Sequence, residues 1–323
     1  MATSDVCFPV HFRQPGKMAR TQMGMGRSLE QALASGQLVT TVEITPPLGG
    51  DPSRALAAAE SLRDRVQAFN VTDGSRAVMR MSSLALCRLL QERGLEPVLQ
   101  LGCRDRNRIA LQGDLLGAHA LGIRNVLCLT GDPVRAGTQP EARSVFDLES
   151  VRLLQQVQAL NDGIDPTGKP LVDGAPALFA GAAADPQSGS WSGLKSRTRR
   201  KAQAGARFFQ TQMVMDPEAL RRFCGEITDP LGLPVLAGVF LLKSAKNASF
   251  INRVVPGVHI PQDLIDRLAA AHDPRQEGIR IAAEQVQAYS SIASGVHLMA
   301  VKAEESLVQV LDLAGLPKVV AQV

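Results

Sequence analysis

Short apolar runs alternate with amphipathic stretches along the chain from residue 28 onward. Each run is apolar at nearly every position and rich in β-branched residues, which is typical of a strand buried on both faces. Strands of that kind belong to a parallel sheet that is covered by helices. The eight predicted strands are Leu38–Thr45, Val66–Asp73, Pro97–Cys103, Asn125–Gly131, Ala177–Ala184, Phe208–Met215, Pro234–Leu242 and Gly295–Val301.

The stretches between these runs repeat apolar residues every three to four positions, as the buried face of a helix does. Before the first strand, Ser28 and Gln31 have the spacing of a helix start with a polar cap, and Gly36 ends that helix. The other predicted helices are Ser53–Arg65, Ser82–Arg93, Arg106–Leu121, Leu148–Leu160, Gly193–Ala204, Pro217–Glu226, Ala245–Val254, Pro261–Ala271, Gln276–Ile292 and Ala303–Ala314.

A regular strand-then-helix order predicts an α/β protein, and eight such units fit a closed (β/α)8 TIM barrel in a single domain over residues 28–323. The alternative is an open, doubly wound sheet. Such a sheet needs a glycine-rich phosphate turn after its first strand, whereas Pro46 and Pro47 follow the first strand here. Residues 1–27 have no apolar period, and we interpret them as a flexible N-terminal arm.

Composition excludes several classes of protein. The net charge of +4 is small and both signs are mixed along the chain, which argues against a nucleic-acid binder. No run approaches the roughly 18 apolar residues of a membrane span, and the N-terminus does not resemble a secretory signal. The five cysteines form no close pair, which is typical of reduced thiols in a cytoplasmic protein and excludes a zinc knuckle.

In a barrel of this kind, the active site forms at the carboxyl ends of the strands. Glu43 interrupts the first apolar run and shares its side-chain direction with Thr41 and Thr45. If that direction is the lumen, burial raises the pKa of Glu43 and suits it to general acid catalysis. The alternative is a solvated carboxylate at the end of a strand.

Other polar residues lie at or near the ends of most predicted strands. They are Thr72, Asp73, Gln100, Asp132, Asp185 and Gln212. Turn chemistry alone could explain Asp132, which lies between Gly131 and Pro133. The basic run Lys195–Lys201 fits either a solvated helix face or an anionic ligand such as a cofactor diphosphate. His297, inside an apolar run, is interpreted as a core histidine, and no residues have the spacing of a metal site.

Several sequence blocks in register resemble the methylenetetrahydrofolate reductase family. They are VEITPP around Glu43, NVTDG at 70–74, HALGIRNVLCLTGDP at 119–133, KAQAGARFFQTQMVMD at 201–216 and AGVFLLKSAKNASFINRVVPGVHIP at 237–261. CRDRN at 103–107, GDLLGAHALGIRN at 113–125 and SVFD at 144–147 are most similar to reductase modules that are often fused to a homocysteine methyltransferase. The resemblance covers the chain from about residue 38 to about residue 313.

The resemblance implies a flavoprotein oxidoreductase in which NADH or NADPH reduces FAD, and the flavin then reduces 5,10-methylenetetrahydrofolate to 5-methyltetrahydrofolate. It implies that Glu43 protonates N10 of the folate and that Asp132 lies near flavin and pterin. It also implies a cytoplasmic enzyme of one-carbon metabolism and methionine biosynthesis, and leaves homo-oligomerisation open. The implied cofactor contacts are Thr72, Gln100, Gly131, Asp132, Asp185 and Lys201, and the implied substrate contacts are Glu43, Asp132, Gln212 and Asn247.

The chain departs from the family pattern at three places. Gln100 stands where many members have histidine, the eighth strand lacks aromatic residues, and the run Arg197–Arg200 replaces acidic and amide residues. These departures concern the FAD contacts more than the folate contacts. They leave open a flavin-free or partner-dependent reductase of the same fold, or a non-catalytic barrel that binds one-carbon folates.

Overall fold

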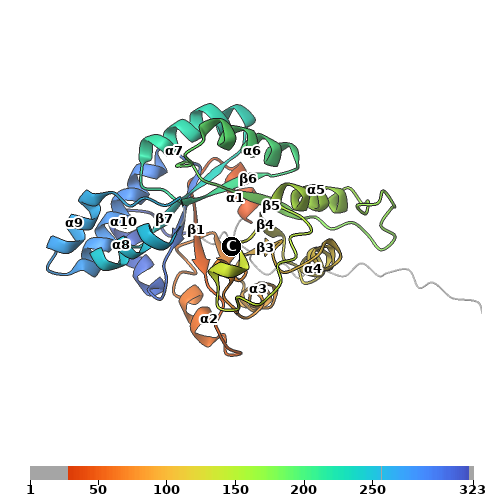
Figure 1. Ribbon diagram of the computed structural model, residues 1–323, viewed down its shortest axis with the longest axis horizontal. Helices are drawn as coiled ribbons and strands as arrows, with labels where there is room; N and C mark the ends of the chain where they lie inside the picture. The colour runs from red at the N-terminus through yellow and green to blue at the C-terminus, as the bar shows by residue number, and fades with distance from the viewer. Residues whose placement is uncertain (1–27, 256, 320–323) are drawn as a thin grey trace, which may run out of the picture.

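The computed structural model describes residues 28–255 and 257–319, so the predicted arm at 1–27 lies outside the described residues. Eight parallel strands close into a barrel in chain order, and helices surround them (Figure 1). The predicted (β/α)8 TIM barrel is therefore confirmed. The strands are β1 (Val39–Ile44), β2 (Ala68–Val71), β3 (Pro97–Gly102), β4 (Asn125–Leu129), β5 (Phe179–Ala184), β6 (Phe208–Met213), β7 (Val235–Phe240) and β8 (Gly295–Met299).

Each predicted helical stretch contains a helix, with different ends in several cases. The helices are α1 (Leu29–Ala34), α2 (Ser53–Glu60), α3 (Ser83–Gln91), α4 (Arg108–Ala120), α5 (Ser150–Asn161), α6 (Trp191–Gln203), α7 (Pro217–Phe223), α8 (Ala245–Val254), α9 (Gln262–Ala270), α10 (Pro274–Ser290) and α11 (Leu307–Leu313). Short 3-10 turns follow β2 at Ser75–Ala77 and β4 at Val134–Ala136.

Local hydrogen bonding explains the helix ends that the sequence misplaced. The second helix was expected to reach Arg65, but it ends at Glu60 because the next amides bond to carbonyls only three residues back. The last helix begins at Leu307 instead of Ala303, since residues 304–306 form a 3-10 turn. Helix α6 begins two residues before the predicted Gly193, because the Ser190 hydroxyl caps its first turn.

The amino-terminal end of the barrel is filled with apolar side chains and covered by α1. Leu29 and Leu33 of this helix pack against the lowest residues of the lumen, among them Val39 and Leu236. The predicted cap is present, because Ser28 and Gln31 each accept a hydrogen bond from the backbone amide of the other. A ligand can therefore enter the lumen only from the carboxyl ends of the strands.

The seventh strand is followed by two additional helices before α10. Helices α8 and α9 lie beside α10 at one side of the barrel, at the left in Figure 1. A second apolar cluster joins them to the barrel mouth through Met213, Met215 and Met299. No helix among the described residues is long and apolar enough to cross a membrane.

Candidate active site

Side-chain direction alternates along each strand, so the lowest lumen residues show which other residues face inward. Val39 belongs to the apolar cluster of the lumen. Thr41 and Glu43 follow it at intervals of two and therefore face the same way. Glu43 is thus placed at the inner mouth of the barrel, near the carboxyl end of β1, as the sequence suggested.

Above the apolar layer, the lumen contains a polar layer. Asn70 donates to Gln210 across the barrel at 2.9 Å and accepts from Gln100 at 3.4 Å. On the other side, the Thr41 hydroxyl lies 2.9 Å from Nδ1 of His297. Burial lowers the pKa of His297 to about 3, so the imidazole is neutral at physiological pH. His297 is therefore the core histidine that the sequence favoured.

The carboxyl group of Glu43 keeps its proton to a higher pH than an exposed glutamate does. Burial raises the pKa of Glu43 to about 7, the negative charge of Glu304 adds to this rise, and the positive charge of Arg80 opposes it. A carboxylic acid with this pKa retains much of its proton at pH 7 and can donate it to a bound substrate. Glu43 thus has both the position and the protonation expected of a general acid.

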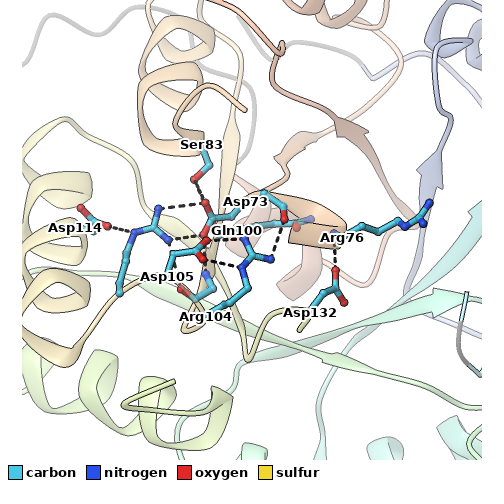
Figure 2. A network of polar contacts seen from close by, with 11 residues as sticks. Asp73, Arg76, Ser83, Gln100, Arg104, Asp105, Asp114 and Asp132 are labelled. Carbon is cyan, nitrogen blue, oxygen red and sulfur yellow. Dashed lines mark hydrogen bonds and ion pairs between the residues drawn. The ribbon is translucent and has the colours of Figure 1, made fainter. Parts of the chain in front are cut away.

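A network of ion pairs joins the carboxyl ends of β2 and β3 (Figure 2). Asp73 accepts two hydrogen bonds from the Arg106 guanidinium, at 2.7 and 3.2 Å, and one from the backbone amide of Gly102 at 2.9 Å. The Ser83 hydroxyl also lies 3.3 Å from Asp73, and Arg106 reaches Asp114 at 2.8 Å. The Asp73 side chain is only 10% exposed, so these contacts satisfy a nearly buried charge.

Next to this network, Arg104 fills the space between the ends of β2 and β4. Its guanidinium donates to the carbonyl of Gly74 and to Asp105, and a Cβ on Gly131 would lie 3.0 Å from the Arg104 side chain. Asp132 is exposed at the rim and accepts a hydrogen bond of 2.6 Å from the backbone amide of Arg76 (Figure 2). Asp132 therefore anchors the turn that follows β2.

That turn has a backbone conformation that non-glycine residues rarely adopt. Arg76 and Ala77 have φ values of 57° and 53°, in the left-handed region. The amide of Thr138 donates to the carbonyl of Ala77, which joins the turn to the segment after β4. Strain of this kind persists only where surrounding contacts enforce it, and the bond from Arg76 to Asp132 is one of these contacts.

Two predicted cofactor contacts are buried within the lumen. Thr72 is 1% exposed, and its hydroxyl has no hydrogen-bond partner among the described atoms. Gln100 is 6% exposed, and its amide bonds to Asn70. Neither side chain reaches the open rim where Gly131 and Asp132 lie.

The fifth strand places two other predicted residues at the mouth. The Lys201 ammonium donates to the carbonyl of Ala183 at 2.7 Å, and burial lowers its pKa. Asp185 accepts from the amide of Gln187 at 3.0 Å, and burial raises its pKa. In the basic run on α6, Arg199 and Arg200 are exposed and form no ion pair with any residue that the structure describes.

The predicted folate contacts differ in their exposure. Gln212 is exposed and follows an irregularity of β6, where the register to β7 shifts between Gln210 and Met213. Asn247 is partly buried in the first turn of α8, and its side-chain oxygen accepts from the amide of Lys243 at 3.2 Å. Both residues lie on the carboxyl-terminal side of the barrel, where a substrate of Glu43 would bind.

Two hollows open among the loops on this side. One of about 620 Å³ is lined by Trp191, Met215 and His259, and one of about 370 Å³ is lined by Arg80, Arg104 and Arg106. Glu43 lines neither hollow, so the candidate general acid lies in the lumen and outside both of these cavities. Over residues 28–255 and 257–319, no group of three or more histidine, cysteine or acidic side chains could hold a metal ion.

The sequence interpretation missed four charged residues of this site: Arg80, Arg104, Arg106 and Glu304. The block at 103–107 contains two of them directly after the third strand, and that position could have drawn attention to them. Arg80 and Glu304 lie in loops, and no spacing in the sequence connects either of them to Glu43.

The closed barrel with an acidic residue at its inner mouth defines a TIM-barrel protein with the site expected of an enzyme. Residues 28–315 match the methylenetetrahydrofolate reductase family, and the chain belongs to this family. Over 249 residues it is 26% identical to a probable methylenetetrahydrofolate reductase (NADPH) of Caenorhabditis elegans, covering 73% of this chain and 35% of that protein. Over 231 residues it is 25% identical to methylenetetrahydrofolate reductase 1 of Schizosaccharomyces pombe, covering 69% of this chain and 36% of that protein.

The chain therefore spans about a third of the length of these two relatives. Among solved structures, it is similar to an uncharacterised protein from Clostridium thermocellum that binds two copies of 5-methyl-5,6,7,8-tetrahydrofolic acid. The TM-score is 0.63 at 14% sequence identity, and the match covers 88% of this chain and 97% of that one. At this identity the likeness supports the fold alone.

Proposed function

We propose that the protein reduces 5,10-methylenetetrahydrofolate to 5-methyltetrahydrofolate, with Glu43 as the general acid. The observation that carries the proposal is the Glu43 carboxyl group, whose pKa is raised to about 7 at the inner mouth of the barrel. Membership of the methylenetetrahydrofolate reductase family supports the choice of substrate.

The reaction needs both a proton and a hydride. Glu43 donates its proton to N10 of the folate, and the bond from N10 to the bridging carbon breaks to leave an iminium. A hydride, which comes ultimately from NADH or NADPH, then adds to that carbon and completes the methyl group on N5. An acid held near its pKa at working pH accelerates such a step by roughly 10²–10⁴-fold.

The residues around Glu43 are proposed to hold the folate. Asp132 and Gln212 are exposed at the mouth, and Asn247 lies at the start of α8 beside it. Carboxylate and amide groups match the donors and acceptors of a pterin edge. The carboxylate of Asp132 already accepts the Arg76 amide, so its second oxygen is the one assigned to the pterin.

FAD is proposed as the cofactor that passes electrons from the nicotinamide to the folate. The basic run Lys195–Lys201 lies on α6, and its cationic groups match the charge of a dinucleotide diphosphate. Gly131 and Asp132 are exposed at the rim at the carboxyl end of β4, and Asp185 is partly exposed. These residues are the ones assigned to hold FAD, together with Lys201 of α6, whose ammonium donates to the carbonyl of Ala183.

A flavin-free reductase of the same fold is the second candidate, and one observation favours it. Thr72 and Gln100, two of the implied FAD contacts, are buried in the lumen at 1% and 6% exposure. A flavin that contacted them would require neighbouring side chains to move. In this alternative the nicotinamide would deliver its hydride directly to the folate.

The visible spectrum of the purified protein distinguishes these candidates, because oxidised flavin absorbs near about 450 nm. The same preparation is assayed for NADH- and NADPH-dependent formation of 5-methyltetrahydrofolate. Yellow protein with this activity supports the FAD enzyme, and colourless protein with the activity, unchanged by added FAD, supports the flavin-free enzyme. Absence of the activity with both nucleotides and with added FAD contradicts the proposed function.

A further inference from the structure

Two charged loop residues flank the end of the strand that carries Glu43. Strand β1 pairs with β2 on one side and with β8 on the other. Arg80 lies in the connection from β2 to α3, and Glu304 lies in the connection from β8 to α11. Both connections leave from the end of the barrel at which Glu43 is located.

Arg80 is fixed against the segment that follows Glu43. Its guanidinium donates from Nη1 to the carbonyl of Pro46 at 2.8 Å, three residues beyond Glu43. Its Nε is buried and has no hydrogen-bond partner among the described atoms. A buried guanidinium donor without a partner is costly, and its charge acts on the carboxyl group of Glu43.

Glu304 is held by a strained turn. Lys302 has a φ of 56°, and its amide donates to the Glu304 carboxylate at 3.2 Å. The Glu304 side chain is partly buried, whereas its neighbour Glu305 is exposed and pairs with Arg275 at 2.6 Å. Two consecutive glutamates thus have different surroundings, and it is the charge of Glu304 that acts on Glu43.

We propose that Glu304 and Arg80 are positioning residues that act through Glu43, the one favouring its protonated form and the other its ionised form. This inference rests on the proposed role of Glu43 as the general acid. Neither residue belongs to the set that the resemblance to known reductases implies. Their charges are the ones that act on Glu43, because His297 of the neighbouring strand is neutral and the Lys302 side chain is exposed.

The opposed charges have a use in a catalytic cycle. Burial alone makes the carboxyl group reluctant to release its proton, and Arg80 stabilises the carboxylate that remains after release. Glu304 favours the return of a proton before the next turnover. An acid of this kind works best when its pKa lies near the working pH, and two opposed charges keep it there.

The test is the titration of Glu43 itself, followed as the infrared carbonyl band of the protonated carboxyl group. The Glu43→Gln variant identifies the band by its absence. In Glu304→Gln the midpoint of the titration is expected to fall by roughly one pH unit, and in Arg80→Gln to rise by a similar amount. The pH above which folate reduction declines is expected to move in the same direction in each variant.

Matched variants separate a charge effect from a packing effect. Glu305→Gln removes a carboxylate one residue away and is expected to leave the midpoint in place. Arg80→Lys keeps the charge and is expected to move the midpoint less than Arg80→Gln, even if one of the neutral variants fails to fold. A midpoint that stays unchanged, or moves in the opposite direction, in Glu304→Gln and Arg80→Gln overturns the inference.

The failure of this inference is distinct from the failure of the proposed function. If Glu43→Gln retains folate reduction, the role of Glu43 as general acid is wrong, whatever its titration shows. The other outcome is that Glu43→Gln abolishes folate reduction while the titration midpoint of Glu43 stays unchanged in Glu304→Gln and Arg80→Gln. In that case Glu43 is the general acid, and the proposed effect of Glu304 and Arg80 on its pKa is wrong.

Discussion

Glu43 and Asp132 are both carboxylates near the ends of barrel strands, but their different surroundings suit them to different chemical roles. Glu43 faces the lumen and has a pKa of about 7. Asp132 is exposed and bonds to the amide of Arg76. A buried acid is suited to proton donation, and an exposed anion is suited to binding and to electrostatic effects on a bound ligand.

We expect Glu43→Gln to lower the rate of folate reduction by roughly 10²–10⁴-fold, because glutamine cannot donate a proton to N10. Oxidation of the nicotinamide with an artificial acceptor should stay near the wild-type rate, since that half of the reaction does not require a proton donor to the folate. Steady-state assays of both reactions check this. A variant that keeps half of the wild-type folate turnover would contradict the assignment.

Asp132→Asn should slow hydride transfer to the folate and weaken folate binding, because the variant loses a negative charge at the mouth. If FAD is bound, the same change should raise the flavin potential, since a nearby anion disfavours the anionic reduced form. Asparagine can still accept the Arg76 amide, so the fold should be preserved. Stopped-flow measurement of the two half-reactions tests this prediction. If the rate of folate reduction and the affinity for folate are unchanged in Asp132→Asn, Asp132 has only its role in the turn.

At the scale of elements, the ends of β2 and β3 are joined by side chains instead of by the sheet alone. Asp73 follows β2 and Arg106 precedes α4, and their ion pair ties the two connections together. The Arg106 side chain is 22% exposed and the Asp73 side chain 10%. By contrast, the pair of Arg108 and Asp147 has side chains that are 50% and 29% exposed.

Arg106→Gln is therefore expected to lower the free energy of unfolding by about 3 kcal/mol, because it leaves Asp73 nearly buried without its counter-ion. The amide of Gly102 and the Ser83 hydroxyl still bond to Asp73, which limits the loss. Arg108→Gln serves as the control and should cost much less, as the loss of an exposed ion pair does. Urea denaturation measures both, and equal losses would refute the difference in burial as the cause.

At the scale of the whole molecule, the lumen is layered from apolar to polar along the barrel axis. Helix α1 closes the apolar end, the amide layer around Asn70 lies above it, and Glu43 lies at the open end. A carboxyl group in this position lowers the stability of the fold when it ionises, since the lumen disfavours its charge. Catalytic function is thus opposed to stability at this residue.

The stability of the protein should depend on pH through Glu43. Its pKa rises from 4.5 to about 7 on folding, so its contribution to stability is full below about pH 4.5 and is lost as the pH rises through 7. Glu43→Gln is neutral throughout, and at pH 8 we expect it to be more stable than the wild type by about 3 kcal/mol. Urea denaturation at pH 5 and pH 8 checks this, and an advantage of equal size at both values would exclude ionisation as its origin.

The sequence alone was sufficient for the strand order, the barrel and the side-chain direction that Glu43 shares with Thr41 and Thr45. Local periodicity carries this information, because a buried parallel strand is apolar on both faces and side chains alternate with a period of two. It also indicated the cap at Ser28 and the burial of His297. Each of these features depends on residues that are close together in the chain.

Only the tertiary structure decided which polar strand-end residues are accessible and which charges surround the acid. It buried Thr72 and Gln100 in the lumen, and it brought the loops of Arg80 and Glu304 to either side of β1. These outcomes depend on loop conformation and on contacts between segments up to 261 residues apart, such as Glu43 and Glu304. Periodicity determines which side of a strand is buried, but the conformation of the loops determines what a buried carboxyl group meets at the mouth of the barrel.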